Sequence, residues 1–174
     1  MITIQEGKLE FQFPDKWHAT AYDKWSFYQD RFKDCCCGNK AVDILARDPA
    51  RTVWMIEVKD YRQHRRTKDI HLWDEIAIKA RDTLAGLVAA KFAIGHPQQN
   101  EADMSLSASK LRVILHLEQP VKHSKLFPRV FDPEIMRLKL RQLLKPIDAH
   151  PRVIELNNMV HVPWTASPIS RPES

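Results

Sequence analysis

Hydrophobic and polar residues alternate over several short stretches of this chain and recur with helical spacing over others. Residues 2–13 alternate around the turn-forming pair Glu6-Gly7, which predicts a small N-terminal hairpin or strand. Aromatic and apolar residues then recur every three or four positions after Pro14-Asp15, so we expect a first helix from about residue 15 to residue 32. Its aromatic stripe is typical of a helix packed on a core.

The next stretch predicts two strands joined by a short turn. Residues 41–47 (AVDILAR) and 52–60 (TVWMIEVKD) are rich in apolar and β-branched residues, and Asp48-Pro49 interrupts them. The interruption is short enough for a hairpin loop. Side chains alternate along a strand, so Glu57 and Lys59 share one face of the second strand.

The second half of the chain predicts further helices and strands in turn. Apolar residues follow helical spacing from about residue 69 to residue 94, and Gly95 is suited to end that helix. Gly86 inside the helix costs about 1 kcal/mol relative to alanine, which indicates close backbone packing at this position. The remaining expected elements are a polar connection at 96–110, a strand at 111–118, a helix from Asp132-Pro133 to about 145 and a strand at 152–156.

This order of elements predicts an α/β protein in which helices flank a mixed β-sheet. A length of 174 residues and a hydrophobic fraction of 44% suit one domain with one sizeable core. We therefore expect a single domain over residues 1–162, including the N-terminal β segment. Residues 163–174 are rich in proline and serine and are expected to form a flexible tail.

Composition narrows the environment and the chemistry of the protein. No apolar run approaches the ~20 residues needed to cross a bilayer, and the first residues lack the layout of a secretory signal, so we expect a cytoplasmic protein with no membrane partner. The three cysteines are consecutive, at positions 35–37, which fits neither a CxxC zinc site nor a disulfide framework and instead predicts a short, partly buried strand. The four glycines form no phosphate-binding loop, which argues against an NTP-driven enzyme.

The predicted hairpin brings charged residues together in an apolar setting. With a turn near Pro49-Ala50, Asp43 lies opposite Glu57, with their Cβ atoms about 5 Å apart and their charges repulsive without a cation. Two hard oxygen ligands suit Mg²⁺, or Mn²⁺, with water and phosphate oxygens completing the coordination. Such a metal polarises a phosphate and lowers the pKa of a bound water. Lys59 could orient or help deprotonate that water, or stabilise the developing negative charge.

These segments resemble the PD-(D/E)xK, or restriction-endonuclease-like, nuclease superfamily. The likeness lies in Val42-Asp43-Ile44, a turn and then Met55-Ile56-Glu57-Val58-Lys59. The matching core runs from about residue 15 to residue 118, or alternatively to residue 156. The resemblance implies a mixed sheet with an αβββαβ core. It also implies metal ligation by Asp43, Glu57 and the backbone carbonyl of Val58, with Lys59 as the catalytic lysine.

The chain departs from this family pattern at several places. Ala41-Val42 replace the proline that often precedes the aspartate, and Lys79 leaves the Gln-x-x-x-Tyr element of some members without a match. Asp23 is the candidate for an added acidic ligand on the first helix. The bare Glu-x-Lys spacing also occurs in Glu6-Gly7-Lys8, so the neighbouring apolar strands are what give the second occurrence its weight.

A basic segment follows the candidate site directly. It contains Arg62, Arg65, Arg66 and Lys68. These cations are suited to binding phosphates without reading sequence, or to forming a solvated loop, and the sequence leaves both readings open. Lys79 on the next helix either faces substrate or is a surface charge.

The function expected from these observations is a metal-dependent endonuclease, with DNA favoured over RNA as its substrate. A non-catalytic nucleic-acid-binding or assembly subunit on the same fold is the alternative, since a fold does not fix a function. An RNA nuclease is a further alternative. Few residues lie outside the predicted core, so a larger target would call for a homodimer or a partner protein.

Overall fold

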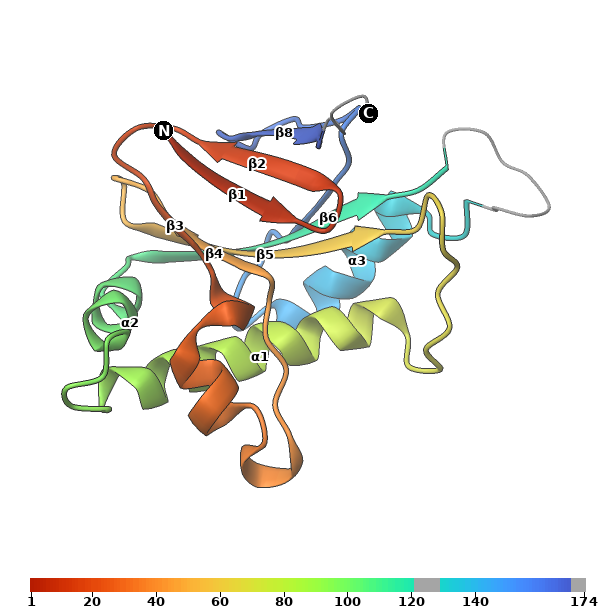
Figure 1. Cartoon of the computed structure of the whole chain (residues 1–174). Coiled ribbons are helices and arrows are strands. Elements are labelled where there is room, and N and C mark those ends of the chain that lie inside the picture. The colour runs from red at the N-terminus through yellow and green to blue at the C-terminus, as the bar shows by residue number, and fades with distance from the viewer. Residues whose placement is uncertain (121–128, 170–174) are drawn as a thin grey trace, which may run out of the picture.

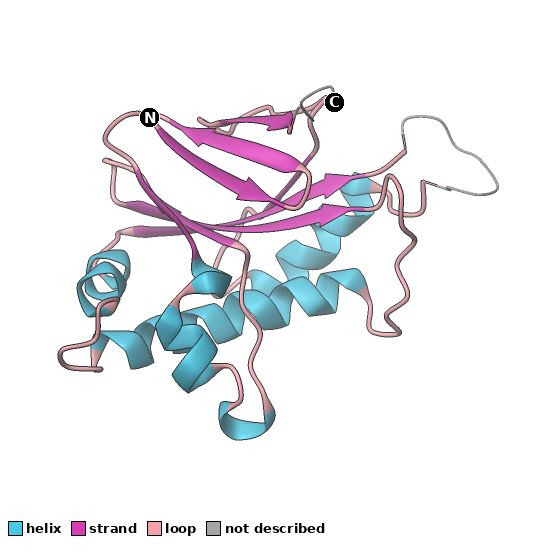
Figure 2. Cartoon of the chain, viewed as in Figure 1, coloured by secondary structure: helices cyan, strands magenta, loops and turns pink. Residues whose placement is uncertain are grey.

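The computed structural model describes residues 1–120 and 129–169, which form three layers (Figure 1, Figure 2). A five-stranded sheet of order β3-β4-β5-β6-β7 lies between a three-stranded sheet of order β1-β2-β8 and the helices α1 and α3. The strands are β1 (Ile2–Glu6), β2 (Leu9–Phe13), β3 (His18–Ala21), β4 (Ile44–Arg47), β5 (Thr52–Asp60), β6 (Lys110–Glu118), β7 (Arg152–Ile154) and β8 (Thr165–Pro168). The helices are α1 (Leu72–Lys91), α2 (Gln99–Leu106) and α3 (Pro133–Leu144).

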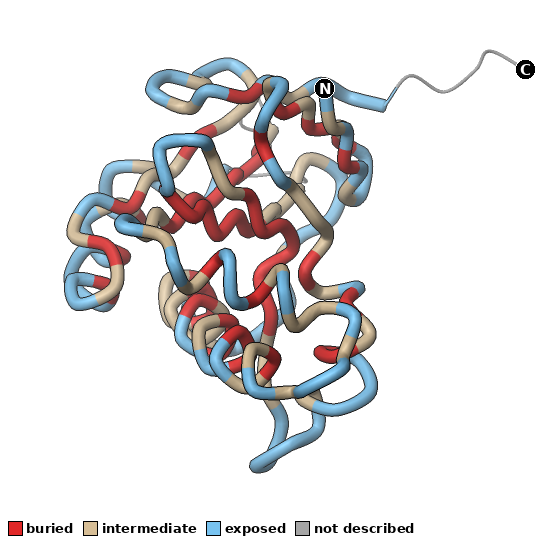
Figure 3. Tube along the Cα trace, turned by 90° about the vertical axis from the view of Figure 1, so that its left-hand side faces the viewer, coloured by how far each residue is buried: buried red, intermediate tan, exposed pale blue. Residues whose placement is uncertain are grey.

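The two longest described strands, β5 and β6, run parallel, and β4 pairs antiparallel with β5. Val53 and Met55 of β5 pack in the core cluster shared with α1 and α3, whereas Trp54 and Ile56 pack in the cluster shared with the smaller sheet. The predicted alternation along residues 52–60 is therefore confirmed. Because both faces of β5 are covered, the strand is apolar throughout its first half. Figure 3 shows the buried residues gathered in the middle of the molecule.

The smaller sheet confirms one expectation and corrects another. The N-terminal hairpin forms as predicted, with Gly7 in the left-handed backbone conformation (φ 58°) at its turn. Residues 165–168, expected to belong to a flexible tail from 163 onward, instead form β8, which pairs antiparallel with β2. Hydrogen bonding to the open edge of the hairpin orders this segment despite its polar composition. Residues 170–174 lie outside the described part of the chain.

The expected first helix is wrong over its first half. Residues 18–21 form β3 and pair with β4, and helical turns follow only at η1 (Tyr22–Lys24) and η2 (Tyr28–Phe32). The aromatic stripe is in fact divided between two faces of the sheet: Trp17 packs with the smaller sheet and Tyr22 packs with the helices. Their helical spacing is a coincidence that pairing with β4 overrides.

The three cysteines are not a buried strand. They form a single 3-10 turn, η3 (Cys35–Cys37), in which all three side chains are free and exposed. Cys36 and Cys37 have positive φ angles of 51° and 70°, which no strand accommodates. The element order is therefore strand, helical turns, strand, strand, helix, helix and strand, rather than the helix-first αβββαβ order.

The helices follow the prediction more closely. α1 lies inside the expected range, and α3 begins as predicted, with the Asp132 carboxylate accepting hydrogen bonds from the backbone amides of Glu134 and Ile135. The prediction of a polar connection is wrong at α2, because this helix is mostly polar, buries only the small residues Ala102 and Ser105, and so has no apolar stripe in its sequence. The general α/β architecture, with helices packed on a mixed sheet, is confirmed.

Gly86 on α1 allows the close approach that its sequence context indicated. A Cβ atom added there would overlap the Tyr22 hydroxyl and lie 3.2 Å from the ring of Phe32. Residues 22–32 therefore pack directly on the backbone of α1. Across the ranges that the structure describes, no helix is long and apolar enough to cross a bilayer.

Candidate active site

Asp43 and Glu57 face each other across the β4–β5 hairpin. Ile44 pairs with Ile56, so the next position outward places Asp43 opposite Glu57, as the register predicted. The Glu57 side chain is fully buried and that of Asp43 nearly so. The backbone amide of Val58 donates to Asp43 Oδ2 at 2.7 Å, which fixes the orientation of this carboxylate against β5.

Helix α1 holds the segment that leads into Asp43. The backbone amide of Lys40 donates to Asp82 Oδ2 at 2.9 Å, and that of Val42 donates to Thr83 Oγ1 at 3.1 Å. These two polar side chains are buried on the helix face that meets the sheet. They replace the strand partner that residues 40–42 lack, and they set the height of Asp43 relative to α1.

Two lysines meet on one oxygen of Glu57. Lys59 Nζ lies 2.6 Å from Glu57 Oε1, and Lys79 Nζ lies 2.5 Å from the same atom. Lys79 Nζ also lies 3.3 Å from Asp43 Oδ1, so its ammonium group bridges the two carboxylates. The structure thus brings Asp43, Glu57, Lys59 and Lys79 into one cluster, and the pair of carboxylates already has a cation between its members.

The charge on Glu57 is only partly compensated. Burial and the nearby negative charge of Asp43 raise the pKa of Glu57 to about 7, although Lys79 and Lys59 act in the opposite direction. Burial alone would lower the pKa of Lys59 and of Lys79, but the charge of Glu57 outweighs it and the pKa of each lysine is raised. The site therefore holds two ammonium groups that stay charged and one carboxyl group, that of Glu57, whose pKa of about 7 lies near neutral pH.

Two buried carboxylate oxygens at or near the cluster lack a hydrogen-bond partner within the described residues: Glu57 Oε2 and Asp23 Oδ1. Asp23 comes from η1, which precedes the segment carrying Asp43. Burial raises the pKa of Asp23, and the charges of Glu6 and Asp43 raise it further. A buried oxygen without a donor is costly, so both atoms are suited to an additional positive partner.

Glu75 is a member of the site that the sequence reasoning missed. Its buried carboxylate accepts from Arg66 Nη1 and from Lys68 Nζ, each at 2.6 Å, and Lys59 Nζ lies 3.6 Å away. Burial would raise the pKa of Glu75, but these hydrogen bonds and the nearby lysines lower it to about 2. The available signal was helical periodicity, which places Glu75 one turn before Lys79 on the face of α1 that meets the sheet.

The basic segment is engaged with acids of the protein itself. Arg62 pairs with Asp60 at 2.7 Å, and both Arg66 and Lys68 pair with Glu75. Arg66 is largely buried and also donates to the backbone carbonyl of Ile70 at 2.6 Å. Arg66 therefore ties the loop to α1, while Arg65 and Lys68 lie on the surface. Phosphate binding by Arg62, Arg65, Arg66 and Lys68 stays a prediction.

The donor set limits what metal this site would hold. Within residues 1–120 and 129–169, no group of three or more histidine, cysteine, aspartate or glutamate side chains is arranged to hold a metal ion. Asp43 and Glu57 supply hard oxygen donors, and no hydrogen bond from within those same ranges competes for Glu57 Oε2. Two carboxylates with water and substrate oxygens fit Mg²⁺ or Mn²⁺, and they do not fit a closed structural zinc site.

Comparison with known proteins yields one match with a curated protein. The chain is 31% identical over 211 aligned positions to a cysteine–tRNA ligase of Neisseria meningitidis serogroup A / serotype 4A (strain DSM 15465 / Z2491). The alignment covers 96% of this chain and 30% of that protein, so the chain spans less than a third of its relative's length. No family model matches the chain, and no solved structure matches it.

Proposed function

We propose that this protein is a divalent-metal-dependent nuclease of the PD-(D/E)xK type, which hydrolyses phosphodiester bonds, with DNA favoured as the substrate. The observation that carries the proposal is the Asp43–Glu57 pair, with Lys59 bound to Glu57 at 2.6 Å. Its restriction-endonuclease-like fold is part of the proposal. A mixed sheet with a helix packed behind the hairpin supports that fold, although β3 precedes the helical turns.

A metal is expected here for electrostatic reasons. Asp43 and Glu57 lie opposite each other in a buried setting, where like charges are costly without a cation. In this structure the ammonium group of Lys79 contacts both carboxylates and compensates part of their charge. Among the described residues, the buried Glu57 Oε2 nevertheless has no hydrogen-bond partner, and the pKa of Glu57 is raised, so further positive charge would stabilise this carboxylate. When bound, Mg²⁺ or Mn²⁺ polarises the scissile phosphate and lowers the pKa of a coordinated water.

Asp43, Glu57 and the backbone carbonyl of Val58 are the proposed ligands. The hydrogen bond from the Val58 amide leaves Asp43 Oδ1 as the outward oxygen, which Lys79 now contacts. Asp23, whose buried Oδ1 has no hydrogen-bond partner in the described part of the chain, is the candidate for an added acid near the site. Lys59 stands between Glu57 and Glu75 as a fixed positive charge, a position suited to stabilising negative charge that develops on a phosphate.

A plasmid-nicking assay with Mn²⁺ tests the proposal directly. We expect the wild-type protein to nick the plasmid, and we expect Asp43→Asn and Lys59→Met to lower the rate at least a hundred-fold. Glu134→Gln removes an exposed acid on α3, and Lys110→Met an exposed lysine at the start of β6, so both serve as matched controls and should retain full activity. Equal activity in the site variants and the controls would overturn the assignment.

RNA is the second candidate substrate, favoured by one specific observation. The curated relative is named as a ligase that acts on tRNA. The same assay should therefore include a labelled tRNA, and cleavage of tRNA without cleavage of DNA would move the proposal to an RNA nuclease. A protein that binds nucleic acid and cleaves neither, and whose Mn²⁺ binding does not depend on Asp43, would be the non-catalytic subunit instead.

A further inference from the structure

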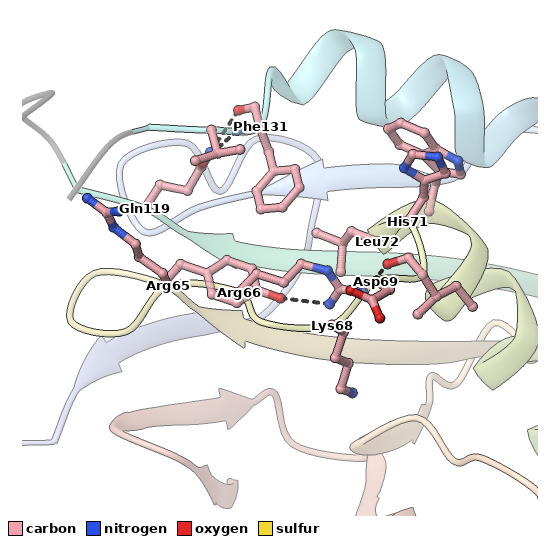
Figure 4. Close-up of a pocket in the computed structure, with 12 residues that line it drawn as sticks. Arg65, Arg66, Lys68, Asp69, His71, Leu72, Gln119 and Phe131 are labelled. Carbon is pink, nitrogen blue, oxygen red and sulfur yellow. Dashed lines mark hydrogen bonds between the residues drawn. The ribbon is translucent and has the colours of Figure 1, made fainter. Parts of the chain in front are cut away.

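A cleft opens beside the candidate active site, between the segment that follows β5 and a wall made by Gln119, Val130 and Phe131. Its volume is about 530 Å³, which lies within the usual range for small-molecule and cofactor pockets. Figure 4 shows the cleft, with the rings of Phe131 and His71 on either side of Leu72 and the Arg66 side chain extending beneath them. The cleft therefore combines aromatic surfaces with cations.

Two pairs of aromatic rings line this cleft. Tyr61 and Phe131 lie with their ring centroids 5.6 Å apart, and His71 and Trp73 are stacked at 4.6 Å with 19° between their planes. His71 is exposed, and Phe131 and Trp73 are half-buried, so parts of these rings face solvent. A flat aromatic ligand could continue the stacking that the side chains have begun.

The aromatic walls are held in place before any ligand arrives. The side-chain amide of Gln119 donates to the carbonyl of Phe131 and accepts from its backbone amide, both at 2.9 Å. On the other side, Arg66 donates to the Tyr61 hydroxyl at 3.3 Å and to the Ile70 carbonyl at 2.6 Å. Gln119 is 3% exposed. The arrangement is preorganised, which lowers the ordering cost of binding.

The cleft is joined to the active site through Glu75. Lys68 lines the cleft and contacts Glu75 Oε1, the same oxygen that Lys59 approaches. Arg66 contacts the other oxygen of this carboxylate. Arg65 also lines the cleft. A phosphate bound near Lys59 would thus lie close to the cleft, and the cations between the two sites suit a polyanionic backbone.

We propose that this cleft binds an unpaired nucleobase of the substrate, so that the enzyme acts on single-stranded nucleic acid. In a duplex the face of each base is covered by its neighbours, and only an unpaired or flipped base can lie against Phe131 or His71. Stacking accepts every base, because every base has a flat π-face. DNA and RNA share this chemistry.

The inference rests on the proposed nuclease function, but its test is independent of cleavage. Binding is measured by fluorescence anisotropy in EDTA, with labelled dT20, U20 and a 20-base-pair duplex as probes. We expect either single strand to bind at least ten-fold more tightly than the duplex. His71→Ala and Phe131→Leu should each weaken single-strand binding about ten-fold, which corresponds to ~1.4 kcal/mol. Emission from 2-aminopurine in the strand should fall on binding to the wild type and much less with Phe131→Leu.

The controls separate a stacking role from a structural one. Phe92 is a largely exposed aromatic residue just after the far end of α1, so Phe92→Leu matches Phe131→Leu and should bind like the wild type. His71 is exposed and makes no side-chain capping bond to α1, so His71→Ala should fold normally even if Phe131→Leu does not.

Three results would overturn the inference: equal affinity for duplex and single strands, unchanged binding by both cleft variants, or a free nucleotide such as TMP binding as tightly as the oligonucleotide. Failure of the nuclease function gives a different pattern. The wild-type protein would then cleave nothing with Mn²⁺, while the cleft variants would still bind single strands more weakly than the wild type. If the protein instead cleaves single strands and duplexes equally, the nuclease proposal stands and the proposed role of the cleft is wrong.

Discussion

Replacing Glu57 with glutamine should abolish the pH dependence of stability that this residue imposes on the metal-free protein. Glu57 is fully buried, and its pKa is raised from an ordinary value of 4.5 to about 7 by burial and by the charge of Asp43, against the effect of the two lysines. Glutamine resembles the protonated acid in size and carries no charge. The substitution therefore removes the titration while keeping most of the packing.

The direction and size of this pH effect on stability follow from the linkage between proton binding and folding. Between pH 4.5 and about 7 the native protein keeps a proton on Glu57 that the unfolded chain has already released, so the free energy of unfolding falls as the pH rises. The favourable contribution of the neutral acid is complete below pH 4.5 and is lost above pH 7. A change in pKa from 4.5 to about 7 corresponds to about 3 kcal/mol.

The measurement is urea denaturation of the wild type and Glu57→Gln in EDTA, at intervals from pH 5 to pH 8.5. Differences between the two proteins cancel the titration of groups that both retain. We expect the free energy of unfolding of Glu57→Gln, relative to that of the wild type, to rise by about 2–3 kcal/mol across this range. The exposed Glu134→Gln variant should show no such trend. Saturating Mn²⁺ should stabilise the wild type at pH 8 and leave Glu57→Gln unchanged.

A flat difference between pH 5 and pH 8.5 would refute the reasoning, because it would mean that the lysines compensate Glu57 completely. A difference that falls with rising pH would be a stronger contradiction. It would mean that ion pairing with Lys59 and Lys79 exceeds the cost of burial.

Three further predictions follow from the packing and charges around α1. Gly86→Ala should lower the free energy of unfolding by about 1–3 kcal/mol despite the better helix propensity of alanine, because the added Cβ meets the Tyr22 hydroxyl. In thermal denaturation the double variant with Tyr22→Phe should recover part of that loss, and no recovery would contradict the clash. Glu75→Gln should destabilise the protein at pH 7, and progressively less as the pH falls from 4.5 towards 2. The lowered pKa of Glu75 contributes stability that is present above pH 4.5 and is lost on acidification. An equal loss of unfolding free energy at pH 7 and at pH 3 in urea denaturation would argue against this reasoning. The Lys79→Met variant should bind Mn²⁺ several-fold more tightly in calorimetry, because the wild-type Lys79 ammonium contacts both carboxylates and competes with the metal. Weaker binding by the variant would show that Lys79 supports the ligands instead.

Much of the hairpin that carries the site could be predicted from residues close together in sequence. Alternation along 52–60 placed Glu57 and Lys59 on one face, and the break at Asp48-Pro49 set the register that brings Asp43 opposite Glu57. The cap at Asp132 is another local feature that the structure confirms. These features depend on the repeat of a strand or on one helical turn, and a linear pattern contains that information.

Other parts of the fold depended on which segments meet. Residues 18–21 have helical spacing to their neighbours, yet they form β3 because the open edge of β4 offers backbone partners. Residues 165–168 became a strand for the same reason, by pairing with β2. A local sequence pattern does not predict which strand edge is open for pairing, since the hydrogen bonds at that edge join residues distant in the chain.

The composition of the site beyond the hairpin was likewise decided by tertiary structure. Glu75 and Lys79 reach the Asp43–Glu57 pair only because α1 packs across the helix-facing side of the sheet, and Asp23 comes near through the turns that follow β3. The aromatic cleft joins residues 61–73 to Gln119, Val130 and Phe131. The sequence by itself thus determined a pair of opposed acids and a lysine on one strand. The fold decided which distant charges and rings surround them, because burial and charge compensation depend on neighbours in space.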